Sequence, residues 1–202
     1  MALRRVGVFG GTFDPVHFGH LAAAEDAAYL LSLDQVLFVP NRTPPHKPPQ
    51  RITPVQHRVA MLKMAIEGNP LFLLSTVEID RPGPSYTLDT MRRLKCECGL
   101  ETELYFLTGC DSLAQLHTWH EPEQLLEEFQ FVILDRPTER DVDWSVVEGH
   151  FPLIRSQIEV VHVIQLEISS SDIRQRVAAG RPIRYYVPAS VEKYIGEKSL
   201  YR

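Results

Sequence analysis

The chain has 202 residues, a formal net charge of −5 and an apolar content of 44%. This length suits one α/β domain and lets the chain bury a core without disulfides. The mild acidic balance argues against bulk binding to nucleic acid or to an anionic membrane, but it leaves room for a local site that takes a small anion.

The three cysteines have the spacing of neither a disulfide framework nor a zinc knuckle. No signal peptide is visible, and no apolar run approaches membrane-spanning length. We therefore expect a cytoplasmic protein with reduced thiols and no membrane partner.

Strand-like and helix-like segments alternate along the chain. Apolar runs predict strands over residues 4–10, 35–40, 71–79, 103–109, 130–135 and 158–164. Composition and helical spacing predict helices over residues 20–33, 53–69, 87–98, 122–129, 169–180 and 188–198. Thr53, Thr87 and a serine are expected to cap three of these helices, and Gly180 is expected to end one.

This β-α-β-α rhythm predicts an α/β fold in which helices cover both faces of a mostly parallel sheet. We expect residues 1–202 to form a single domain, with a small helical C-terminal part over about residues 165–202. The charged, irregular segment 136–156 is expected to be a surface insertion. Ligands of such sheets bind outside the carboxyl ends of the strands, and the unusual residues of this chain lie there.

The most unusual stretch is VGVFGGTFDPVHFGH, residues 6–20. Gly10 and Gly11 follow the first expected strand, where they let a ligand approach main-chain N–H groups. His17 and His20 fall near the start of the next helix, where free N–H groups and the helix dipole favour an anion. The cluster predicts phosphate binding, in preference to a plain turn with surface histidines or to a metal site that includes Asp14.

A second helix start with anion-binding groups follows the last expected strand. In SSSDIR, Ser170 and Ser171 offer hydroxyl and N–H groups, and Arg174 lies about one turn further on. The guanidinium fork suits the outer phosphates of a triphosphate, and the alternative is an ordinary serine cap with a solvated arginine.

Two groups follow other strand ends. His46 and Lys47 lie in a proline-rich loop, which is either a cationic contact to an anionic substrate or a polyproline spacer. Gly109 permits close approach of a ligand, and Asp111 can accept from ribose hydroxyls or cap a helix. Arg136 is a weaker candidate for a phosphate contact.

Two groups suit a planar ring that carries a carboxylate. Trp119 can stack on a ring or fill the core. Ser85 and Thr87 lie in PSYT at a helix start, whose N–H groups can bind a carboxylate or serve as a simple cap.

Together these motifs resemble a known family. GGTFDPVHFGH and ISSSDIR resemble the two signatures of the nucleotidyltransferase superfamily. PNRTPPHK, PSYTLDTM, GCDSL, the Trp119 context, ILDRP and the ending YYVPASVEKYIGEKSLYR resemble bacterial nicotinate-nucleotide adenylyltransferases. The likeness runs from about Val6 onward and is weakest between Arg136 and Ser156, and Cys110 and His120 depart from the pattern of many relatives.

The resemblance implies a Rossmann-like parallel sheet flanked by helices on both faces. It implies adenylyl transfer from ATP to nicotinate mononucleotide in NAD biosynthesis, with Mg²⁺ and with deamido-NAD and pyrophosphate as products. The implied partners are these two nucleotides, with a homo-oligomer left open. The alternatives are an adenylyltransferase for nicotinamide mononucleotide or phosphopantetheine, and a non-catalytic nucleotide-binding protein.

The resemblance also implies roles for individual residues. The expected catalytic residues are His17, His20 and Arg174, and no metal ligand from the protein is expected. The expected ATP-binding residues are Gly10, Gly11, Thr12, Phe13, His17, His20, Gly109, Asp111, Ile168, Ser170, Ser171 and Arg174. The expected mononucleotide-binding residues are Thr12, Phe13, Asn41, His46, Lys47, Ser85, Thr87, Trp119 and Arg136.

A direct mechanism follows from the chemistry of phosphates. The second pKa of a phosphate ester is about 6, so the attacking phosphate is already ionised near neutral pH and needs no general base. No activated nucleophile is visible, so we expect in-line attack without a covalent intermediate.

Overall fold

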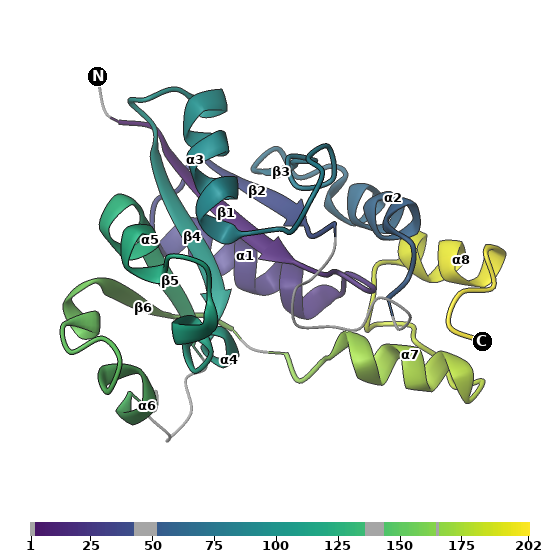
Figure 1. Ribbon diagram of the computed structural model, residues 1–202. Coiled ribbons are helices and arrows are strands. Elements are labelled where there is room, and N and C mark those ends of the chain that lie inside the picture. The colour runs from purple at the N-terminus through teal and green to yellow at the C-terminus, as the bar shows by residue number, and fades with distance from the viewer. Residues whose placement is uncertain (1–2, 43–51, 136–143, 165) are drawn as a thin grey trace.

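The computed structural model describes residues 3–42, 52–135, 144–164 and 166–202. Within these residues the chain forms a six-stranded parallel sheet with the order β3-β2-β1-β4-β5-β6 (Figure 1). The strands are β1 (Arg5–Gly11), β2 (Gln35–Pro40), β3 (Phe72–Leu74), β4 (Glu103–Gly109), β5 (Gln130–Asp135) and β6 (Ile158–His162). The order reverses between β1 and β4, which is the switch point where such sheets bind ligands.

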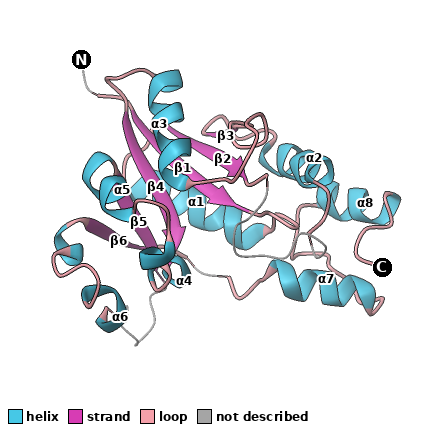
Figure 2. Ribbon diagram, in the orientation of Figure 1, coloured by secondary structure: helices cyan, strands magenta, loops and turns pink. Residues whose placement is uncertain are grey.

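Helices cover both faces of the sheet, as the sequence predicts (Figure 2). They are α1 (Phe18–Leu30), α2 (Val55–Ile66), α3 (Thr87–Cys98), α4 (Cys110–Leu113), α5 (Pro122–Glu128), α6 (Ser145–Glu148), α7 (Ser170–Ala178) and α8 (Ala189–Glu197), with the 3-10 turns η2 (Leu116–Thr118) and η3 (Ile154–Ser156). None of the helices in the described part of the chain has the length and apolarity needed to cross a membrane.

Successive side chains along the strands point alternately into two hydrophobic cores, one on each face of the sheet. Along β4, Tyr105 and Leu107 belong to the core shared with α1, α2, α7 and α8. Leu104 and Phe106 belong to the core shared with α3, α4 and α5. Because both faces of β2, β4 and β5 are buried, their central residues form continuous apolar runs, and this explains why the sequence reveals these strands.

Small residues bring α1 close to the centre of the sheet. Its buried side is made of alanines, namely Ala23, Ala24, Ala27 and Ala28. In β1 beneath it, a Cβ at Gly7 would lie 2.8 Å from the Leu33 side chain. The tight packing fixes the start of α1 directly beyond the end of β1.

The C-terminal helices α7 and α8 occupy the segment where the sequence predicts a small helical part. The Ser169 hydroxyl caps α7 by accepting a hydrogen bond from the Asp172 N–H at 3.0 Å, which confirms the predicted serine cap. Gly180, with a φ of +67°, follows the end of this helix, as predicted.

Three predicted elements or caps are wrong in detail. The expected strand 71–79 shortens to β3, because the Thr76 hydroxyl donates to Asp80 at 2.6 Å and the chain turns there. Thr53 does not cap α2; its N–H donates to Asp14 instead. Thr87 is the first residue of α3 and Tyr86 holds the cap position.

Two further expectations need correction. Asp111 lies inside α4 and does not cap it, since Gly109 precedes the helix. The segment 136–156 is no surface insertion in its described part, because Val147, Phe151 and Ile154 are buried in the core on the α3 face. Burial of these apolar side chains is favourable, so this part of the segment packs against the core although the segment also carries many charged residues.

Candidate active site

The carboxyl ends of β1, β2 and β4 open into a cavity of about 610 Å³. This volume is in the usual range for sites that hold small molecules. The sequence-predicted residues that line it are Gly10, Gly11, Thr12, His17, His20, Asn41, Ser85, Thr87, Gly109, Asp111, Trp119 and Ile168. The fold thus brings groups from distant parts of the sequence to one cavity.

The two histidines lie together at the start of α1. Their rings stack with centroids 3.7 Å apart, and the main-chain N–H of His17 donates to Nδ1 of the His20 ring at 3.3 Å. A Cβ at Gly19 would come within 3.0 Å of the His17 ring, so this glycine makes room for the stack. The geometry explains the Phe-Gly-His spacing that follows His17.

His17 is electrically neutral near pH 7. Its side chain is 6% exposed, and burial lowers its pKa to about 4. Its Nδ1 has no hydrogen-bond partner among the described residues, although it is buried. His17 therefore brings no charge to the cavity near pH 7.

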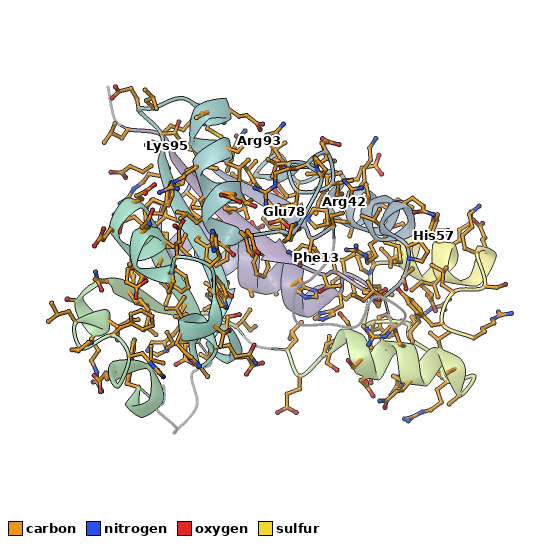
Figure 3. All side chains as sticks on the ribbon, viewed as in Figure 1. Phe13, Arg42, His57, Glu78, Arg93 and Lys95 are labelled. Carbon is orange, nitrogen blue, oxygen red and sulfur yellow. The ribbon has the colours of Figure 1, made fainter. Side chains whose placement is uncertain are left out.

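Phe13 supports the cavity from below and is not among its lining residues. Its ring is 2% exposed and contacts Phe9, Phe38 and His20 at centroid distances of 5.9, 5.7 and 5.1 Å. A Cβ at Gly11 would lie 2.9 Å from this ring. Figure 3 shows Phe13 in the central part of the molecule, where it fixes the turn after β1.

The start of α7 docks on the turn between β1 and α1. The Ser170 hydroxyl donates to the Pro15 carbonyl at 2.9 Å. Arg174 donates to the Asp14 carbonyl at 2.6 Å and to the Ser171 hydroxyl at 3.1 Å. Arg174 thus reaches the turn that carries the histidines, while Ser170, Ser171 and Arg174 lie outside the cavity lining.

A buried carboxyl group lies on the β2 side of the cavity. Glu78 is 6% exposed, accepts from the Asn41 amide at 3.1 Å and accepts from the Thr90 hydroxyl at 2.9 Å (Figure 3). Sequence reasoning missed Glu78, because it lies in a stretch that reads as a strand. Its contact with Asn41 fixes the orientation of an amide that faces the cavity.

Aromatic rings close the end of the cavity near α3. Tyr86 stacks on His120 with centroids 4.3 Å apart, and Trp119 meets Phe106 edge-on at 5.8 Å. The Ser85 hydroxyl is buried without a hydrogen-bond partner in the described part of the chain. Trp119 therefore lines the cavity and also packs against the core on the α3 face.

Residues after β4 and before α7 form the opposite end. A Cβ at Gly109 would meet nothing within 4 Å, so this position faces open space. The Thr108 hydroxyl donates to the Ser112 hydroxyl at 2.8 Å, and Asp111 and Ile168 also line this end.

Other cavity residues were not assigned from sequence. Tyr86 and His120 adjoin predicted positions, and this adjacency is the signal that could have found them. The unassigned lining residues are Phe9, Gly19, Ala23, Glu78, Tyr86, Phe106, Thr108, Ser112, Gln115, Thr118, His120, Leu134 and Leu166.

Three predicted site residues, His46, Lys47 and Arg136, lie outside the described residues. Among the described residues, no group of three or more His, Cys, Asp or Glu side chains suits a metal ion. The Asp14 carboxylate accepts hydrogen bonds from the Tyr201 hydroxyl and the Thr53 N–H.

Comparisons with known proteins show the family to which the chain belongs. The cytidylyltransferase-like family matches residues 8–176. A probable nicotinate-nucleotide adenylyltransferase of Thermomicrobium roseum is 47% identical over 200 residues, which cover 99% of this chain and 92% of the relative. The chain belongs to the nicotinate-nucleotide adenylyltransferase family. Another relative of this name, from Roseiflexus sp., is 43% identical over 202 residues and is covered over 100% of both chains.

Solved structures support the fold of this adenylyltransferase. A Plasmodium falciparum nicotinic acid mononucleotide adenylyltransferase, complexed with NaAD, matches with a TM-score of 0.77. The match covers 98% of this chain and 97% of the other at 22% identity. The Rossmann-like fold and the nucleotidyltransferase class expected from the sequence are thus confirmed, and enzymes of this class that use ATP generally work with a divalent metal ion.

The departure at Cys110 places a thiol between Gly109 and Asp111, which line the cavity, and this thiol is unreactive. The Cys110 thiol donates to Asp135 at 2.9 Å, and burial followed by that contact raises its pKa to about 12. A thiol of this kind stays protonated near neutral pH and is a poor nucleophile.

Proposed function

We propose that this enzyme transfers the adenylyl group of ATP, bound with Mg²⁺, to nicotinate mononucleotide, releasing pyrophosphate and deamido-NAD. The observation that carries the proposal is one cavity that is lined both by Gly10, Gly11 and Thr12 at the end of β1 and by the Ser85–Thr87 and Trp119 groups. Such a cavity can hold two nucleotides with their phosphates facing each other. We place this activity in the cytoplasm, in keeping with three free cysteines.

The triphosphate binds where β1 meets α1. The dipole of this helix attracts the phosphates, and Gly10 and Gly11 let the main chain come close. The main-chain N–H groups of His17 and Phe18 already donate to His20 Nδ1 and to the Tyr186 carbonyl. Since His17 is neutral, it donates a hydrogen bond to phosphate and adds no charge. Arg174 stabilises the leaving pyrophosphate, and a divalent ion bound to ATP would offset part of the phosphate charge.

The transfer itself is a single displacement. An oxygen of the mononucleotide phosphate attacks the α-phosphorus, and the bond from that phosphorus to the pyrophosphate oxygen breaks. No proton has to move, because both phosphates are ionised near neutral pH. Catalysis then comes from positioning and charge stabilisation, and the protonated Cys110 thiol takes no part.

The pyridine ring binds at the end of the cavity near α3. Trp119, Tyr86 and His120 offer flat faces for the ring. The ring carboxylate faces the N–H groups at the start of α3, whose dipole favours an anion over an amide. The unpaired Ser85 hydroxyl supplies a further donor.

The mononucleotide phosphate is the remaining anion. Asn41 faces the cavity at the end of β2. We propose that His46 and Lys47 of the following loop, together with Arg136, approach the same phosphate, because cationic side chains offset its charge.

An acceptor comparison tests the function. The pure protein is incubated with ATP and Mg²⁺, and with nicotinate mononucleotide, nicotinamide mononucleotide, phosphopantetheine or no acceptor, and pyrophosphate is measured. We expect fast release with nicotinate mononucleotide, slower release with the amide and none without an acceptor. Faster release with phosphopantetheine, or ATP binding without any release, would contradict the proposal.

A further inference from the structure

Asp14, in the turn between β1 and α1, is held by three separate segments of the chain. The Tyr201 hydroxyl donates to Oδ1 at 2.8 Å, and the Thr53 N–H donates to Oδ2 at 3.1 Å. Arg174 donates to the main-chain carbonyl of Asp14 at 2.6 Å. Asp14 is 3% exposed, so its side chain serves these contacts and does not face solvent.

The chain bends back after α8 to bring Tyr201 to this turn. Tyr201 has a φ of +66°, a left-handed conformation that few residues other than glycine adopt. Its ring packs against the core on the α1 face, and the Leu200 N–H donates to the Ile195 carbonyl at 3.1 Å. Burial, followed by the Asp14 carboxylate, raises the pKa of Tyr201, so the phenol keeps its proton and donates.

A buried arginine fixes the neighbouring main chain. Arg58 is 1% exposed and donates to the carbonyls of Thr12 at 2.7 Å, Asn41 at 2.7 Å and Thr53 at 3.0 Å. It therefore anchors the ends of β1 and β2 and the approach to α2. The Asp14 side chain, two residues beyond Thr12, is held separately by Tyr201.

We propose that Tyr201 is a positioning residue for adenylyl transfer. Its hydroxyl holds Asp14, and the Asp14 carbonyl in turn holds Arg174 beside the turn that leads to His17. The hydroxyl touches no substrate; it acts through the placement of Asp14 and Arg174. The inference rests on the proposed function, and it assigns part of the catalytic geometry to a residue far from both signature motifs.

The substitution Tyr201→Phe removes the hydroxyl and keeps the ring. The matched control is Tyr194→Phe in α8, whose hydroxyl lies 3.0 Å from His57 Nδ1 (Figure 3 labels His57 beside α8). Both tyrosines are half-buried, and each substitution removes a hydroxyl and keeps the ring. We measure kcat, both KM values and Tm for the two variants and the wild type.

We expect Tyr201→Phe to lower kcat about 10-fold, since small misplacements of catalytic groups are costly, while both KM values stay within about 2-fold. Tyr194→Phe should keep kcat within about 2-fold, and the two variants should have similar Tm values. Equal kcat values for the two variants, or a loss at Tyr201 that a matching loss of Tm accounts for, would overturn the inference.

A double-mutant cycle tests the route through Asp14. In an Asp14→Ala background the hydroxyl has lost its acceptor, so adding Tyr201→Phe should change kcat by less than about 2-fold. Multiplicative effects of the two substitutions would overturn the inference. A wild type that releases no pyrophosphate would instead refute the proposed function and with it this inference, whereas an active wild type matched by Tyr201→Phe refutes the inference alone.

Discussion

Acidification should destabilise this protein through one buried imidazole. His17 is 6% exposed, and its Nδ1 has no hydrogen-bond partner among the described residues. Burial lowers its pKa from 6.5 to about 4 in the folded protein. The unfolded chain therefore takes up a proton at a higher pH than the folded chain does.

The size of the effect follows from this difference in pKa. The contribution of His17 to stability is complete above about pH 6.5, falls as the unfolded state binds its proton, and reaches its full loss below about pH 4. A difference of about 2.5 pKa units corresponds to about 3.4 kcal/mol in full and to about 2 kcal/mol at about pH 5. For a chain of this length, about 2 kcal/mol lowers Tm by about 4–8 °C.

The test compares the wild type with His17→Gln, which has an uncharged side chain and cannot titrate. Urea unfolding at about pH 7.5 and about pH 5 gives the free energy of unfolding of each protein. Other titrating groups contribute to both proteins, so they cancel in the comparison. The wild type should lose about 2 kcal/mol more than the variant. Equal losses would refute the buried, neutral state of His17.

Three further substitutions test other parts of the site. His20→Ala should lower kcat for pyrophosphate release about 10²-fold and weaken ATP binding far less; near-normal turnover would remove His20 from the mechanism. Lys47→Ala should raise the KM for nicotinate mononucleotide and leave the KM for ATP nearly unchanged, and the reverse pattern would refute the loop assignment. Arg58→Met should lower the free energy of unfolding by about 3 kcal/mol in urea, since buried carbonyls lose their donor, and a loss under about 1 kcal/mol would contradict its anchoring role.

The sheet could be predicted wherever a strand lies between two others. The apolar runs at 35–40, 103–109 and 130–135 match β2, β4 and β5 at both ends. These strands are covered on both faces, so the central residues of each run are apolar. The edge strand β3 is shorter than the run that predicts it, because Thr76 and Asp80 end it with a side-chain contact that hydrophobicity does not reveal.

The site residues that lie close together in the sequence could also be predicted. Gly10, Gly11, His17 and His20 lie within one strand-turn-helix unit, so their spacing in the sequence reports their spacing in space. The structure shows why Gly11 has no side chain: a Cβ at this position would lie 2.9 Å from the Phe13 ring.

The residues that hold the site in place from distant segments could not be predicted from the sequence. Arg58 falls in a helix whose basic residues look solvated, yet it is 1% exposed. Its partners are carbonyls at Thr12, Asn41 and Thr53, which come together once the parallel strands are in register. Glu78 and Tyr201 likewise depend on contacts between distant segments, and a pattern along the sequence carries no trace of such contacts.

The charge at the site completes the mechanism. His17 is neutral, Glu78 and Asp111 bring no positive charge, and the chain as a whole has a net charge of −5. Two phosphorylated substrates nevertheless have to approach each other in this cavity. Under the proposed mechanism the offsetting charge comes from the dipole of α1, from Arg174 and the sequence-predicted Lys47, and from a metal ion bound to ATP. Under this proposal the acceptor phosphate and ATP meet through a helix dipole and a few cations, and neutral His17 contributes a hydrogen bond and no charge.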